Sequence, residues 1–259
     1  MKKEEKTRER EEYVANTVSR HGSGQLSGLD RFAVQREIEE LFRLNDDHAS
    51  ELILVRHAEP ALRGANGAPG DDPLLSCTGL AQAERLAERL RTLWVETIYT
   101  APERRSHQTA AVLAKSTQRP IQTLEALGDI EFVYDQTWPA ICQHSYSRRF
   151  QENPRWDAMP GFAPGGAFRR RAIEAIESVI GAHAGDRVIV VTHASVINAF
   201  LSILLDVPRD MFFAPDHASV NVVRCLGPAS GTQRQRHGAP GRPALRLVGQ
   251  GHLPNVYAR

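Results

Sequence analysis

Two short apolar runs stand out in the pattern of apolar and polar positions along this chain. Residues 52–55 and 188–191 are each four consecutive apolar residues, several of them β-branched, and each run passes directly into polar residues. Short apolar runs with polar ends are typical of buried strands in an α/β sheet, because both faces of such a sheet are covered. The pattern therefore predicts two buried strands that end at residues 56–57 and 192–193.

Helical periodicity fills much of the chain between and after these runs. Ser76 is placed to cap a helix whose apolar face holds Leu80, Ala83, Leu86, Leu90 and Leu93. Strands alternating with helices favour an α/β fold with a mostly parallel sheet. The other predicted helices cover residues 104–115, 169–184 and 196–204, and the other predicted strands cover 97–100, a short piece from 120, and an antiparallel pair at 219–225 and 244–248.

The remaining segments carry less pattern. Residues 1–48 combine a block of alternating charges with one amphipathic helix, so we expect an N-terminal extension before the main domain at 49–259. Within that domain, residues 124–164 hold two tryptophans and several prolines with little periodicity, which favours a lid-like loop. Residues 227–243 are rich in glycine, proline and arginine and predict a flexible insertion.

Composition and charge argue against several classes of partner. The 259 residues are 41% hydrophobic and 24% charged with a formal net charge of +1, so we expect binding neither to nucleic acid nor to a membrane surface. The absence of a secretory signal and of a membrane-spanning apolar run predicts a cytoplasmic protein. The three cysteines lack metal-site spacing and are expected to be reduced, buried or half-buried thiols. No pair of histidines has the spacing of a zinc site either, so we expect no metal.

Histidines follow both predicted central strands at their carboxyl ends. His57 comes directly after Arg56 at the end of the first run, and His193 follows the second run. Ligands of open α/β sheets bind at the carboxyl ends of the strands, so neighbouring strands would place both imidazoles in one crevice. The segment 99–110, where a third strand passes into a helix, brings an arginine to the same edge. Guanidinium groups suit phosphate oxygens and histidine can attack or protonate near neutral pH, so we expect a dianion site without a carboxylate-rich partner.

Four motifs carry these residues: Val-Arg-His-Ala at 55–58, Leu-Ser-Cys-Thr-Gly-Leu-Ala-Gln-Ala at 75–83, Pro-Glu-Arg-Arg-Ser-His-Gln-Thr-Ala at 102–110 and Val-Thr-His-Ala at 191–194. In this order, they resemble the motifs of the histidine phosphatase superfamily, also called phosphoglycerate mutase-like. The resemblance implies a three-layer α/β/α sandwich with a mostly parallel central sheet. It also implies that His57 is the nucleophile, that Arg56, Arg105 and His193 form a phosphate pocket, and that no cofactor takes part.

A carboxylic acid is expected beside this pocket. Residues 127–132 resemble the family segment that supplies the general acid, and the match puts Asp129 at the acid position. Aspartate is one methylene shorter than the glutamate of the family segment, and Glu125 and Glu131 are alternative acids. Ala167 is a second departure, since family members commonly carry an acidic residue at that point after the paired glycines.

Together, these residues and the resemblance predict a phosphatase that hydrolyses a phosphomonoester through a phosphohistidine on His57, with a small phosphorylated molecule as substrate. A phosphomutase would use the same pocket, but the chain lacks the Arg-His-Gly-x-Ser-x-x-Asn string of the glycolytic mutases. A protein-phosphohistidine phosphatase is a further alternative, because imidazole leaves readily with little help from an acid. From another class, the chain would be a non-catalytic phospho-ligand-binding or regulatory module if Asp129 and Ala167 mark a degraded acid site. The substrate and a homo-oligomeric state are left open.

Overall fold

The computed structural model of this chain describes residues 49–61, 72–130, 148, 152, 154–156, 165–226 and 246–253. The predicted extension at 1–48, the predicted insertion at 227–243 and most of the predicted lid-like loop at 124–164 lie outside these residues, as do Glu131 and Cys142.

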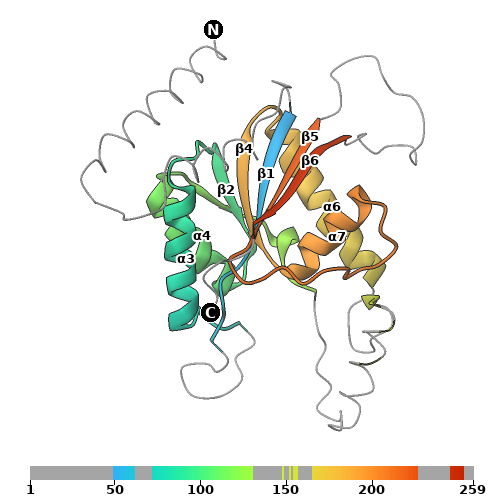
Figure 1. Cartoon of the computed structure of the whole chain (residues 1–259), viewed down its shortest axis with the longest axis horizontal. Coiled ribbons are helices and arrows are strands. Elements are labelled where there is room, and N and C mark those ends of the chain that lie inside the picture. Colours follow the sequence, from blue (N-terminus) through green and yellow to red (C-terminus); the bar gives the residue numbers. More distant parts are fainter. Residues whose placement is uncertain are drawn as a thin grey trace, which may run out of the picture.

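A six-stranded sheet with the order β3-β2-β4-β1-β5-β6 forms the centre of the molecule (Figure 1). The strands β3, β2, β4 and β1 run parallel to one another, while β5 and β6 are antiparallel to their neighbours. The predicted mostly parallel sheet and the predicted antiparallel pair are confirmed. The strands are β1 (Ala49–Arg56), β2 (Thr97–Thr100), β3 (Ile121–Thr123), β4 (Arg187–Thr192), β5 (Val220–Leu226) and β6 (Arg246–Leu253).

The two apolar runs of the sequence are the neighbouring central strands β1 and β4. They pair in parallel, with Arg56 opposite Thr192 at their carboxyl ends. The backbone N–H of His57 donates to the carbonyl of Thr192 at 2.9 Å, so the ladder continues one residue past β1. This register brings the two residues that follow the strands, His57 and His193, to the same edge of the sheet.

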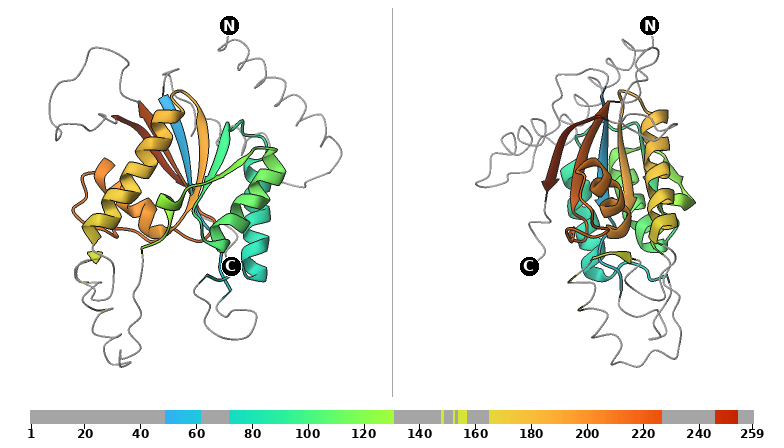
Figure 2. Two further views of the ribbon diagram at one scale, coloured as in Figure 1. Left: turned by 180° about the vertical axis from the view of Figure 1, so that it is seen from behind. Right: turned by 90° about the vertical axis from the view of Figure 1, so that its right-hand side faces the viewer.

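Helices cover both faces of the sheet (Figure 2). The helices α3 (Cys77–Leu90) and α4 (Arg104–Thr117) pack on one face, and α6 (Gly165–Ala182) and α7 (Ala194–Leu204) pack on the other. A 3₁₀ turn, η1 (Glu125–Leu127), contacts α6. The predicted three-layer α/β/α sandwich is confirmed.

Side chains of β1 alternate between the two cores, as they must in an extended strand. Ile53 and Val55 pack with the core under α3 and α4, while Leu52 and Leu54 pack with the core under α6 and α7. All four are fully buried. An apolar residue is therefore required at each of these four positions, which explains why the sequence shows an unbroken run at 52–55 rather than an alternating pattern.

The first turn of α3 differs from its predicted packing. Ser76 caps the helix as predicted, accepting a hydrogen bond from the N–H of Gly79 at 2.9 Å. Leu80, predicted to be buried, is 43% exposed, and Cys77, predicted to be at least half-buried, is exposed too. The reason is that Gly79 faces the neighbouring loop, so the next residue, about 100° further round the helix, turns toward solvent. The other predicted members of the buried face are buried: Ala83, Leu86, Leu90 and Leu93.

Two element boundaries also differ from the prediction. The helix α6 begins at Gly165 rather than at Arg169, because the buried Phe168 lies one turn before Ala172 and extends the same apolar face. The strand β6 continues to Leu253 because it pairs with β5 along its whole length, Val220 opposite Leu253. Within the described residues, no helix has both the length and the apolar character needed to cross a bilayer.

Candidate active site

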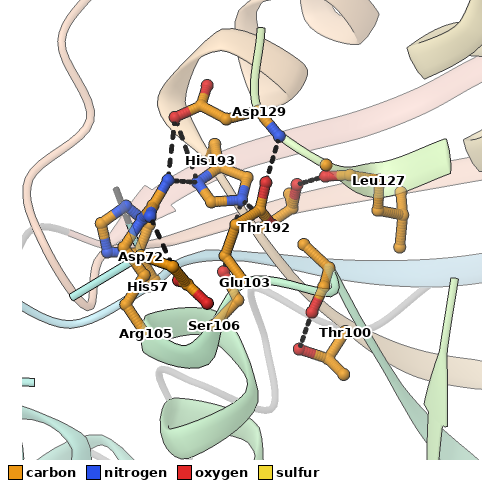
Figure 3. Close-up of polar contacts among 12 residues, drawn as sticks. His57, Asp72, Thr100, Glu103, Arg105, Ser106, Leu127, Asp129, Thr192 and His193 are labelled. Carbon is orange, nitrogen blue, oxygen red and sulfur yellow. Dashed lines mark hydrogen bonds and ion pairs between the residues drawn. The ribbon is translucent and has the colours of Figure 1, made fainter. Parts of the chain in front are cut away.

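Four residues predicted from the sequence meet at the carboxyl edge of the sheet. Arg56 and His57 leave the end of β1, His193 follows β4 as the cap residue of α7, and Arg105 lies in the first turn of α4. The ring centroids of the two histidines are 5.1 Å apart, and Nη2 of Arg105 lies 3.3 Å from Nδ1 of His193 (Figure 3). The two imidazoles and the Arg105 guanidinium therefore lie together at this edge, and Arg56 is near enough to influence the charge of His57. The phosphate-binding role of these residues stays a prediction.

His57 is a buried and neutral imidazole. Its side chain is bonded through Nδ1 to the carbonyl of Ala58 at 2.8 Å, so Nδ1 carries the hydrogen and Nε2 keeps its lone pair. Burial, together with the neighbouring positive groups His193, Arg105 and Arg56, lowers the pKa of His57 to about 2, while the Ala58 carbonyl acts in the opposite direction. A neutral ring with a free Nε2 lone pair is the form of histidine that acts as a nucleophile.

The loop that follows His57 is held by both helices on its side of the sheet. The N–H of Ala58 donates to the hydroxyl of Thr109 in α4 at 3.0 Å, and this hydroxyl donates to the carbonyl of Arg105 at 2.8 Å. The N–H of Glu59 donates to the side-chain carbonyl of Gln82 in α3 at 2.9 Å. The carbonyl that fixes the His57 ring is thus itself fixed on either side.

The two arginines carry charge into a partly buried region. Nη1 of Arg56 donates to the carbonyl of Pro215 at 2.7 Å. Burial lowers the pKa of Arg56, and the carboxylates of Asp129 and Asp216 partly reverse this effect. Nη2 of Arg105 donates to the Asp129 carboxylate at 3.2 Å, and the Arg105 side chain is only 11% exposed. Both guanidinium groups are therefore available at the pocket, with N–H donors that suit a phosphoryl group.

His193 lies between two carboxylates. Its Nε2 is 2.7 Å from Oε2 of Glu103, and its Nδ1 is 3.4 Å from Oδ2 of Asp129. The hydrogen bond and the charge of His193 lower the pKa of Glu103 to about 2, although burial alone would raise it. Together with Asp72, whose Oδ1 is 3.8 Å from Nη1 of Arg105, these carboxylates contradict the expectation of a site without a carboxylate-rich partner. That expectation was wrong because the carboxylates come from loops and helix starts, not from the strand ends that the pattern marked.

Asp129 is the one predicted acid that the described structure brings into the pocket. Besides its contacts with Arg105 and His193, its Oδ1 accepts hydrogen bonds from the hydroxyl of Ser195 and from the N–H of Ile130. Glu125, a predicted alternative, has an exposed side chain, and the other alternative, Glu131, lies outside the described residues. The acid role of Asp129 stays a prediction.

Two residues of the site were missed by sequence reasoning. Glu103 sits in a Pro-Glu-Arg-Arg run that is typical of a solvated helix start, so no local signal marked it. For His217, the sequence indicates no more than a place at the edge of the pocket, and its ring centroid is 5.4 Å from that of His57. His217 just precedes β5, which pairs antiparallel with β1, and this pairing is not visible in the sequence. Burial lowers the pKa of His217 to about 4, and Arg56 contributes to the shift.

Among the residues that the structure describes, no group of three or more His, Cys, Asp and Glu side chains is arranged to hold a metal ion. The guanidinium groups of Arg56 and Arg105 bring positive charge to the site.

Known proteins resemble this chain in sequence and in fold. A sequence profile of the histidine phosphatase superfamily (branch 1) matches residues 52–234. The metal-independent phosphoserine phosphatase of Arabidopsis thaliana is 28% identical over 163 residues, which cover 60% of this chain and 68% of that protein. Phosphoserine phosphatase 1 of Hydrogenobacter thermophilus is 28% identical over 183 residues, 67% of this chain and 85% of that protein. The solved structure of a phosphoserine phosphatase from Entamoeba histolytica with 3-phosphoglyceric acid has the same fold, with a TM-score of 0.56 and 17% identity over 80% of this chain and 98% of that one.

Proposed function

Because this chain belongs to the histidine phosphatase superfamily, we propose that it is a phosphatase that hydrolyses a phosphomonoester by way of a phosphohistidine on His57. The observation that supports this best is the meeting of two imidazoles, from the ends of two neighbouring parallel strands, at 5.1 Å between ring centroids. With Arg56 and Arg105 beside them, a single tetrahedral dianion can contact all four side chains.

In the first step, Nε2 of His57 attacks phosphorus while Nδ1–H stays bonded to the Ala58 carbonyl. A bond forms between Nε2 and phosphorus, and the bond from phosphorus to the leaving oxygen breaks. Arg56 and Arg105 bind the equatorial oxygens, and His193 donates a further hydrogen bond as negative charge builds up.

Asp129 supplies the proton in this proposal. Its carboxylic acid gives a proton to the leaving oxygen, and the resulting carboxylate then takes a proton from the water that attacks the phosphohistidine. The second step releases inorganic phosphate and regenerates neutral His57. The position of Asp129 against Arg105 and His193 supports this role.

The substrate class that we propose is based on the chemistry of the pocket residues and on the names of two relatives. The pocket residues contact only the phosphoryl group, so specificity depends on residues around the leaving group. Two relatives are named phosphoserine phosphatases, and O-phosphoserine is therefore the first substrate that we propose to test. A cytoplasmic location stays a prediction, as does the division into an extension at 1–48 and a phosphatase domain at 49–259.

The test of the nucleophile uses p-nitrophenyl phosphate, whose leaving group needs little protonation. We expect wild-type protein to hydrolyse it and His57→Ala to lose activity by a factor of about 10³ or more, because the covalent step is lost. His107→Ala, at an exposed position on α4, is the matched control. Rapid quench with labelled substrate should trap phosphate on His57; undiminished activity in His57→Ala, or label on another residue, contradicts the proposal.

The alternatives give different products on the same assays. A phosphomutase would return the phosphoryl group to the substrate and would depend on priming by a bisphosphate, whereas a phosphatase releases inorganic phosphate without it. A protein-phosphohistidine phosphatase would act on phosphohistidine peptides and leave phosphoserine intact. A non-catalytic module would bind inorganic phosphate and fail to hydrolyse even p-nitrophenyl phosphate.

A further inference from the structure

His193 is held on both of its ring nitrogens. Nε2 is 2.7 Å from Glu103 Oε2, and the other nitrogen, Nδ1, is 3.3 Å from Arg105 Nη2 and 3.4 Å from Asp129 Oδ2 (Figure 3). The side chain of His193 is 1% exposed, so water does not compete for these contacts. Glu103 therefore lies on the side of the ring that faces away from the phosphate-binding arginine.

The contact with Glu103 determines which nitrogen carries hydrogen. A carboxylate only accepts hydrogen bonds, so Nε2 of His193 carries a hydrogen and donates it. If the ring is neutral, Nδ1 is then bare and cannot donate to a phosphoryl oxygen. Only the doubly protonated ring can keep its bond to Glu103 and donate from Nδ1 at the same time.

Glu103 is itself fixed in an ionised form. The pKa of Glu103 falls to about 2, because the hydrogen bond and charge of His193 outweigh the effect of burial, and the N–H of Asp129 donates to Glu103 Oε1 at 2.8 Å. One carboxylate thus contacts both the second histidine of the pocket and the backbone of the proposed acid. It joins the start of α4 to the start of α7 and to the segment after η1.

We propose that Glu103 is a positioning residue that holds Nε2–H of His193 and stabilises its imidazolium form, so that Nδ1–H is presented to the phosphoryl group. The contribution of Glu103 to catalysis rests on the proposed function, whereas its effect on the ionisation of His193 can be tested without that function. The charged and titratable groups that face His193 are Glu103, the cap residue before α4, Arg105 in α4, Asp129 after η1 and His57 after β1. Glu103 favours the imidazolium, as does Asp129 while it is ionised, whereas Arg105, whose guanidinium can only donate to Nδ1, favours the neutral ring.

The substitution Glu103→Gln tests this role with little change in shape. The amide oxygen can still accept the N–H of Asp129, so the amide NH₂ faces Nε2 and favours a neutral ring with its hydrogen on Nδ1. We expect kcat/KM for p-nitrophenyl phosphate to fall about 10–100-fold, the range for partners that orient a functional histidine. Because the neutral ring of the variant keeps its hydrogen on Nδ1 but carries no charge, we also expect its lower kcat/KM to fall less steeply at high pH than that of wild type, where loss of a proton leaves Nδ1 bare. Glu88→Gln, exposed on α3, should match wild type in both respects; a Glu103→Gln profile that matches wild type would overturn the proposal.

Nuclear magnetic resonance of the ligand-free protein separates this role from a structural one. The His193 ring signals, assigned with a His193→Gln variant, should titrate about one pH unit or more lower in Glu103→Gln, since a neighbouring carboxylate is lost. Glu103→Asp keeps the charge and should keep the titration near that of wild type. A lower melting temperature with an unchanged titration would show that Glu103 is merely structural. If wild-type protein neither hydrolyses p-nitrophenyl phosphate nor traps phosphate on His57, the proposed function fails, while the titration still decides the role of Glu103.

Discussion

His57 and Glu103 are ionisable residues of the same site whose pKa values fall below their ordinary ranges for different reasons. The pKa of His57 falls chiefly because burial disfavours its charged form, and neighbouring positive charges act in the same direction. The pKa of Glu103 falls although burial opposes it, because His193 pairs with its charged form. His57 is thus kept neutral, as the proposed nucleophile must be, and Glu103 is kept charged, as the proposed partner of a His193 imidazolium must be.

The lowered pKa of His57 predicts a specific loss of stability in acid. The folded protein binds this proton only near pH 2, whereas the unfolded chain binds it near pH 6.5, so between these values the unfolded state holds more protons. The free energy of unfolding therefore falls as pH falls through this window, by at most about 1.4 kcal/mol per pH unit from this group. The depressed pKa of Glu103 adds a loss only below its ordinary value near 4.5. The lowered pKa of His217 adds a loss between pH 6.5 and 4.5 as well, so the contribution of His57 in this range is the difference between wild type and a variant without His57.

Urea denaturation at a series of pH values checks this expectation. His57→Asn should show a shallower decline between pH 6.5 and 4.5 than wild type, and His107→Asn measures the effect of removing an exposed imidazole. Parallel declines in wild type and His57→Asn would mean that His57 is charged in the folded protein.

If Asp129 is the general acid, its removal should lower kcat/KM more for a substrate whose leaving group must be protonated than for one whose leaving group needs little protonation. Asp129→Asn should lower kcat/KM about 100-fold or more for O-phosphoserine, whose alkoxide must be protonated, and much less for p-nitrophenyl phosphate. Glu125→Gln, at an exposed position in η1, is the control for the alternative acid. Equal losses on the two substrates, or a larger loss in Glu125→Gln, would argue against Asp129 as the general acid.

At the level of elements, the start of α3 packs directly against the loop that follows His57. A Cβ atom on Gly79 would lie 2.0 Å from the carbonyl oxygen of Glu59, a distance at which the backbone must move. Ser76 adds to this junction by donating to the Glu59 carboxylate at 2.7 Å. The start of the helix and the loop after β1 are thus a single packed unit.

Two glycine substitutions test this junction. Gly79→Ala should lower the free energy of unfolding by about 1–3 kcal/mol through overpacking, and should reduce phosphatase activity because the Ala58 carbonyl moves with the loop. Gly181→Ala is the matched control, because a Cβ there meets nothing within 4 Å, and it should stabilise the protein by about 0.5–1 kcal/mol. Both values come from urea denaturation; a stable and active Gly79→Ala would contradict the packing described here.

At the scale of the whole molecule, the two ends of β1 serve different purposes. Arg56 and His57 leave its carboxyl end at the site, while Glu51, near the other end, is buried and pairs with Arg187 of β4 and with Arg224 of β5, the latter at 2.7 Å. This cluster joins the parallel part of the sheet to the antiparallel part. It lies away from the pocket along the strand.

Loss of the Glu51 charge should therefore affect stability and leave catalysis intact. Glu51→Gln leaves the buried charge of Arg224 without its carboxylate, and we expect the free energy of unfolding to fall by about 3 kcal/mol or more. The kcat/KM of the folded fraction should match wild type. Glu88→Gln, which removes an exposed ion pair with Arg91, should change stability by less than about 1 kcal/mol. A comparable small effect of Glu51→Gln would mean that the buried cluster contributes little.

The sequence by itself determined the central strands and the residues at their ends. The middle of a strand such as β1 is covered on both faces and takes apolar residues at successive positions, so 52–55 and 188–191 are visible as unbroken runs without any knowledge of the fold. Parallel strands then deliver the residues that follow them, His57 and His193, to one edge. The family motifs added Arg105 and Asp129, and the structure brings both into the pocket.

Tertiary structure alone decided the contacts that depend on how separate elements are placed. Glu103 and His193 are 90 residues apart in the sequence. The Glu103 side chain reaches His193 because the start of α4 lies close to the start of α7. A run of charged residues at the start of a helix does not indicate such a contact. Leu80 and Cys77 turn to solvent because Gly79 packs on Glu59, and His217 reaches His57 because β5 returns antiparallel to β1. The apolar pattern of a strand or helix is a property of that one element and can be read from its residues, whereas the protonation of a histidine or the exposure of a leucine depends on atoms contributed by other elements.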